Sequence, residues 1–174
     1  VRRSQNWIGG TRPGNARFIP PPPELVPEAI AALERWIHGD DPLPPLVKAG
    51  LAHVQFETIH PFLDGNGRIG RLLITLLVER WKLLVGPLLY VSLGFKRHRQ
   101  EYYDRLDAVR TSGDWEGWTA FFLQCVRESA DDGVETARSL FTLVGNDRRK
   151  VSEYRATTVT AIRLFDLLPR HPIV

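Results

Sequence analysis

The chain has 174 residues, of which 43% are apolar and 25% charged, the composition of an ordinary globular protein. Its 23 basic and 20 acidic residues leave a net charge of +3, which is weak evidence for a nucleic-acid partner. The single cysteine, Cys125, excludes an intrachain disulfide and a cysteine-based zinc site, and no apolar run approaches the roughly 20 residues that cross a bilayer. We therefore expect a cytoplasmic protein. The absence of methionine favours a fragment of a longer one.

The first 45 residues are rich in proline, which excludes a long continuous helix there. Residues 8–19 predict a short β-hairpin, with Pro13 and Gly14 in a type II turn. The four prolines at 20–23 predict a polyproline stretch, and apolar spacing then predicts a helix over 27–37 that ends at Gly39.

From residue 46 onward the apolar residues follow helical spacing, which predicts an all-α helical bundle with the one short β-hairpin attached. The expected helices cover 46–58, 67–84, 96–110, 115–143 and 150–168. Residues 68–78 are apolar nearly all round, which is typical of a central buried helix. Residues 148–150 predict a solvated connection between helices. We expect two parts, a core over 1–145 and a C-terminal helix and linker over 146–174.

The polar signal of the sequence is concentrated between His60 and Arg71, directly before the apolar helix. Gly65, Asn66 and Gly67 tolerate positive φ, so their N–H groups can form a nest that binds an anion such as phosphate. The start of the next helix favours the same ligand, and Arg68 lies one turn from Arg71 on one helical face.

Two further residues of this segment suggest chemistry rather than binding alone. Asp64 offers a hard oxygen to a magnesium ion on a phosphate chain, and His60 can take a proton near neutral pH. A phosphate loop of the Gly-Lys-Ser/Thr type is excluded because that ending is missing. A zinc site at His60 and Asp64 lacks further ligands. His53 and Glu57, four residues apart on a predicted helix, indicate a surface pair.

Residues 60–71 resemble the complete signature of the Fic family of adenylyl transferases, His-Pro-Phe-x-Asp/Glu-Gly-Asn-Gly-Arg-x-x-Arg. The similarity extends to residues 4–10, to residues 52–59, to Tyr102 and Tyr103, and to residues 113–115. It implies a Fic fold and the transfer of AMP from ATP to a hydroxyl group of a target protein.

The resemblance also implies roles for single residues. His60 would be the general base, and Asp64 would hold Mg²⁺ or Mn²⁺ on the α- and β-phosphates of ATP. The Gly65–Gly67 backbone with Asn66 would cradle the α-phosphate. Arg68 would steady the phosphate chain and Arg71 would hold the γ-phosphate.

Other implied contacts lie outside the signature. Tyr103 and Leu106 would pack on the adenine, near Arg110, where some relatives have asparagine. Residues 8–19 would form a flap on which the target protein docks, and the resemblance allows self-modification and a homodimer. An inhibitory helix would precede Val1, and its removal would leave Arg71 free. DNA would be bound only through a winged-helix region beyond the C-terminus.

The sequence is therefore consistent with three functions. The first is AMP transfer by an enzyme that uses His60. The second is a nucleotide-binding regulatory adaptor. The third is a Fic enzyme that uses another phosphate-containing donor or removes AMP. Gly67 favours AMP transfer, because relatives with a reversed donor tend to carry lysine there.

Overall fold

The computed structural model describes residues 1–84, 86, 89–154 and 158–167. The chain divides into two compact units, Val1–Ala130 and Asp131–Val174. Within the described residues, no helix is both long and apolar enough to cross a membrane.

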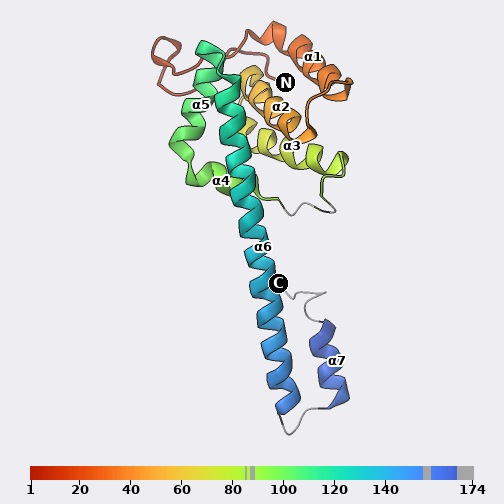
Figure 1. Cartoon of the computed structure of the whole chain (residues 1–174). Helices are drawn as coiled ribbons and strands as arrows, with labels where there is room; N and C mark the ends of the chain where they lie inside the picture. Colours follow the sequence, from red (N-terminus) through yellow and green to blue (C-terminus); the bar gives the residue numbers. More distant parts are fainter. Residues whose placement is uncertain (85, 87–88, 155–157, 168–174) are drawn as a thin grey trace. The chain divides into compact units, whose positions relative to one another are not determined.

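The first unit is a helical bundle, as predicted (Figure 1). Helix α2 packs against both α1 and α3. The elements of this unit are, in chain order, the short 3₁₀ helices Pro13–Asn15 and Pro23–Leu25, α1 (Val26–His38), α2 (Pro45–Ile59), α3 (Asn66–Arg80), α4 (Val91–Arg97), α5 (Arg99–Ser112) and the first part of α6 (Trp115–Glu153).

Helix α2, rather than α3, is the most buried helix of the bundle. It begins at Pro45, where a proline costs no hydrogen bond, and most of its residues are buried. Helix α3 is apolar nearly all round, yet Leu72 and Leu76 are 53% and 52% exposed. The prediction that 68–78 is the central buried helix was therefore wrong.

An aromatic cluster joins α2 to α4, α5 and α6. The indole of Trp118 on α6 donates from Nε1 to the Gly50 carbonyl oxygen on α2, at 2.9 Å. A Cβ atom at Gly50 would lie 2.6 Å from the Phe122 ring, so the close contact of α2 with α6 requires glycine. Phe95 of α4 stacks on Tyr102 of α5 within the same cluster, with ring centroids 4.8 Å apart.

The predicted β-hairpin over 8–19 is wrong, because no strand forms among residues 1–84. A single antiparallel bridge joins Ile8 to Phe18. Gly9 and Gly10 both have positive φ, and the expected type II turn is replaced by the 3₁₀ helix Pro13–Asn15. Two successive left-handed residues bend the chain out of strand geometry, which ends the ladder after one bridge.

The boundaries of the later helices also differ from the prediction. The helix expected over 96–110 is two helices, α4 and α5, which meet at His98. Residues 148–150 lie inside α6, so they are not a connection between helices. Helix α7 (Val159–Leu167) follows, and two contacts between Arg148 and Asp166, at 2.8 and 3.1 Å, join it to α6. The predicted helix end at residue 168 lies outside the described residues.

Candidate functional site

His60 ends α2 in a left-handed conformation, with φ 51° and ψ 61°. Its N–H still donates to the Phe56 carbonyl oxygen at 2.9 Å, and Pro61 disfavours a further helical turn. This backbone conformation costs a non-glycine residue about 1–3 kcal/mol. Buried Arg2 holds the turn, because its Nε donates to the His60 carbonyl oxygen at 3.0 Å and its backbone N–H donates to that of Pro61 at 2.8 Å.

Asn66 closes the loop between His60 and α3. Its side-chain oxygen accepts the Phe62 N–H at 2.9 Å, and its side-chain nitrogen donates to the Phe62 carbonyl oxygen at 2.7 Å. Both polar atoms of the buried Asn66 amide are therefore used within the loop. Phe62 packs on Phe56, with ring centroids 6.4 Å apart, and this contact attaches the loop to α2.

The sequence predicts an anion site at the first turn of α3. Gly65 precedes the helix with φ 84°, a left-handed conformation that suits glycine. The N–H groups of Asn66, Gly67 and Arg68 belong to the first turn, where a helix supplies no acceptors. A Cβ atom at Gly67 would lie 3.1 Å from Arg71 Nη1, so glycine lets this guanidinium lie close to the turn.

Asp64 and Arg68 lie at the open side of the loop. Their side chains are 93% and 75% exposed, and Arg68 Nη2 lies 3.1 Å from Asp64 Oδ2. Among the described residues, no three His, Cys, Asp or Glu side chains group to hold a metal ion. Mg²⁺ on a nucleotide needs only one or two carboxylates, because phosphates and waters complete its shell. The exposed carboxylate of Asp64 fits that requirement.

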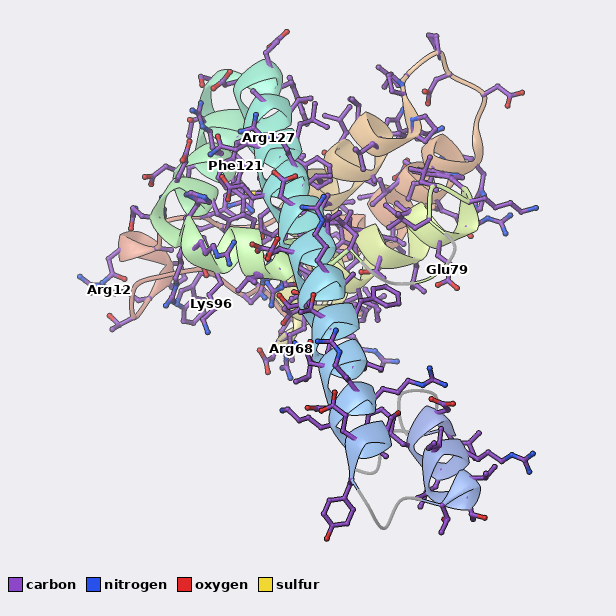
Figure 2. All side chains as sticks on the ribbon, turned by 60° about the horizontal axis from the view of Figure 1, so that its bottom comes forward. Arg12, Arg68, Glu79, Lys96, Phe121 and Arg127 are labelled. Atoms are coloured by element: carbon purple, nitrogen blue, oxygen red, sulfur yellow. The ribbon has the colours of Figure 1, made fainter. Side chains whose placement is uncertain are left out.

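A pocket of about 570 Å³ adjoins the two arginines. Arg68, Arg71 and Leu72 of α3 line one side, and residues of α4 and α5 that include Lys96 and Tyr103 line another. Figure 2 labels Arg68 and Lys96, two of the basic side chains at this pocket. Tyr103 is therefore placed beside the predicted phosphate site. Leu106 is 3% exposed and belongs to the hydrophobic core, so it offers a ligand no accessible surface.

Two contacts attach residues 8–19 to α5. Arg17 forms ion pairs with Asp107 and with Asp104, the latter at 2.7 Å. The guanidinium of Arg110 lies over the Phe18 ring, 4.0 Å from its centroid, and Arg110 Nη2 donates to the Glu57 carbonyl oxygen at 3.0 Å. Arg110 thus links this segment to the last turn of α2, which carries His60.

The predicted surface pair of His53 and Glu57 is wrong, because both residues are buried. Helix α2 is covered on almost every side, so the spacing of four residues does not place them at solvent. His53 Nε2 lies 3.0 Å from the Tyr102 hydroxyl oxygen, and a Cβ atom at Gly70 would lie 2.6 Å from Glu57 Oε1. Glu57 therefore lies beneath α3, one helical turn before His60. The only sequence signal for it was its position beside the loop.

Burial shifts the protonation of the groups around His60. Removal from water lowers the pKa of the His60 imidazole, and the charges of Arg110 and Arg2 act in the same direction, while the Glu57 carbonyl opposes them. Burial raises the pKa of Glu57 to about 7, which Arg110 and Arg71 oppose. Burial also lowers the pKa of His53 to about 4. At neutral pH, His60 is therefore mainly neutral and able to accept a proton.

Comparison with known proteins identifies relatives of this arrangement. The model of the Fic/DOC family matches residues 2–78. A probable protein adenylyltransferase of Aquifex aeolicus is 37% identical over 91 residues, which are 52% of this chain and 26% of that protein. The protein adenylyltransferase Fic of Culex quinquefasciatus is 33% identical over 132 residues, which are 75% of this chain and 24% of that protein.

A solved structure shows the same fold. The crystal structure of a Fic family protein from Desulfovibrio desulfuricans aligns with a TM-score of 0.63 and 34% identity, over 69% of this chain and 36% of that one. The chain spans about a quarter of the length of the two curated relatives above.

Proposed function

Because the chain belongs to the Fic/DOC family, we propose that it transfers AMP from ATP to a hydroxyl side chain of a target protein. One observation carries the proposal. Arg68 and Arg71 line a pocket of about 570 Å³, which is large enough for a nucleotide, and the loop that begins at His60 leads directly into the helix that carries both arginines. The names of the relatives support the reaction.

In this proposal His60 is the general base. Its imidazole takes the proton of the target hydroxyl as that oxygen attacks the α-phosphorus of ATP. The bond between the hydroxyl oxygen and the α-phosphorus forms, the bond to the oxygen that bridges the α- and β-phosphates breaks, and pyrophosphate leaves. A lowered imidazole pKa suits this role, since the base is already unprotonated at neutral pH.

The remaining residues position the phosphates and stabilise their charge, the main requirement of phosphoryl transfer. The N–H groups of Gly67 and Arg68 point from the helix start toward the phosphate chain, and Arg71 holds its far end. Asp64 would bind Mg²⁺, which supplies positive charge against the phosphates. Tyr103 would lie against the adenine.

The target protein would dock on residues 8–19. This segment is held to α5 by Arg17, and its remaining main-chain groups can pair with an extended segment of the target. Figure 2 shows Arg12, in the middle of this segment, pointing away from the helices.

Labelled ATP tests the proposal directly. The chain is incubated with a cell extract and ATP labelled on either the α- or the γ-phosphate. We expect the α-label, and not the γ-label, on a protein band. Transfer of the γ-label would show a different reaction. Loss of AMP from a premodified protein, without α-label transfer, would show the reverse one.

A further inference from the structure

The buried carboxylate of Glu57 faces the buried side of the His60 ring. Glu57 is 7% exposed, and its Oε2 lies 4.0 Å from His60 Nδ1. Within the described part of the chain, neither His60 Nδ1 nor Glu57 Oε1 has a hydrogen-bond partner. Buried polar atoms of this kind are rare in native proteins, and each calls for an explanation.

We propose that Glu57 is a positioning residue for His60, whose carboxylate holds the Nδ1 proton and leaves Nε2 to accept the proton of the target hydroxyl. A carboxylate behind an imidazole fixes both the ring orientation and the tautomer, and it stabilises the imidazolium that forms when Nε2 is protonated. The role of Nε2 as the base rests on the proposed function. The protonation of Nδ1 beside Glu57 does not depend on it.

The separation of 4.0 Å exceeds a hydrogen bond, but the geometry allows it to shorten. Hydrogen bonds of catalytic groups are often long in the absence of substrate and shorten when it binds. Glu57 and His60 lie three residues apart at the end of one helix, so a change of side-chain rotamer is enough. Gly70 supplies the space for this carboxylate, since any side chain there would collide with it.

Charged and titratable groups face Glu57 from each element around it. Arg71 approaches from α3, Arg110 and Tyr102 from α5, and His53 from α2. Arg110 is already committed, because it donates to the Glu57 carbonyl oxygen and pairs with Asp107 at 3.3 Å. The two arginines favour the ionised carboxylate, which is the form that the positioning role requires. Above pH 7 this form predominates.

Nitrogen NMR of histidine-labelled protein tests the inference without any substrate. At pH 8 we expect His60 to carry its proton on Nδ1. Glu57→Gln should weaken this preference at pH 8, where Glu57 is ionised, because a neutral group replaces the charged acceptor 4.0 Å from Nδ1. Glu57→Leu, which also removes the acceptor, should abolish the tautomer preference. An unchanged His60 tautomer at pH 8 in Glu57→Leu would overturn the inference.

The chain offers a matched control in a second histidine–glutamate pair. His98 Nε2 lies 2.8 Å from Glu128 Oε2, far along the sequence from the loop. Glu128→Gln should shift the His98 signals and leave those of His60 unchanged. Circular dichroism confirms that each variant is folded. If Glu57→Gln shifted both histidines equally, the effect would be global and the inference would fail.

Activity separates this inference from the proposed function. We expect Glu57→Gln to lower kcat for α-label transfer at pH 8 at least tenfold and to change KM for ATP less than twofold. Glu57→Asp, which keeps the charge, should recover part of the loss. If the unaltered chain transfers no label, the proposed function fails, while the NMR result still decides the role of Glu57.

Discussion

Asn66 and Phe62 are joined by a reciprocal pair of hydrogen bonds, at 2.9 and 2.7 Å, that closes the loop carrying Asp64. The amide of Asn66 completes the backbone bonding of a residue four positions earlier. The loop therefore owes its shape to a buried side chain as well as to its glycines.

Asn66→Ala should destabilise the protein by about 1–3 kcal/mol, because it leaves the Phe62 N–H without a partner, while the Phe62 carbonyl oxygen keeps its hydrogen bond from Asn6 at 3.2 Å. Urea unfolding measures this loss. Asn15→Ala is the control, since the hydrogen bonds of Asn15 to Thr11 and Arg12 are exposed. Equal losses in the two variants would contradict the assigned role of Asn66.

Asp64→Ala should raise the Mg²⁺ or Mn²⁺ concentration needed for half-maximal transfer at least tenfold and should lower turnover at saturating metal. The reason is that Asp64 is the acidic residue of the loop, and its carboxylate is open to solvent. The measurement is a metal titration of α-label transfer. The same titration with Asp40→Ala, an exposed carboxylate outside the loop and the docking segment, should match the unaltered chain. Metal-independent transfer would refute the assignment.

Glu57→Gln should change how stability depends on pH. Burial raises the pKa of Glu57 from 4.5 to about 7, so the folded state holds this proton more tightly than the unfolded state does. Its contribution to the free energy of unfolding therefore falls as the pH rises through this window, by on the order of 3 kcal/mol. Glutamine has no such proton. The stability of the variant relative to the unaltered chain should increase from pH 4 to pH 8.

Glu128→Gln provides a control of opposite sign for this experiment. Hydrogen bonds from Gln124 and His98 lower the pKa of Glu128, so its ionised form stabilises the folded protein. That variant should lose stability relative to the unaltered chain as the pH rises. Urea unfolding at several pH values gives both trends. A difference for Glu57→Gln that stays constant with pH would contradict the burial effect.

The site loop could be predicted from sequence because its signals are local. Pro61 ends a helix, Gly65 permits a left-handed residue, and the next helix begins directly after it. Glu57 could not be predicted in the same way. Glu57 is buried because α3 and α5 cover α2. Helical spacing in the sequence does not indicate which faces of a helix other helices will cover.

The errors in the fold have physical causes too. Leu72 and Leu76 look like core residues by composition, but α3 has no described neighbour that covers this face. The bridge between Ile8 and Phe18 lies within the predicted hairpin, yet Gly9 and Gly10 turn the backbone away from strand geometry. Whether an apolar residue is buried, and whether a segment forms a strand, depends on tertiary contacts and backbone angles. Residue type alone does not determine either.

The most direct test of the proposed function is the comparison of His60→Ala with the unaltered chain in α-label transfer and in ATP binding. We expect transfer to fall on the order of a hundredfold or more, because the base is lost. The Kd for ATP, measured by calorimetry, should stay within about threefold, since the first turn of α3 and the arginines hold the phosphates. His98→Ala should change neither value. Transfer by His60→Ala at the rate of the unaltered chain would contradict the account.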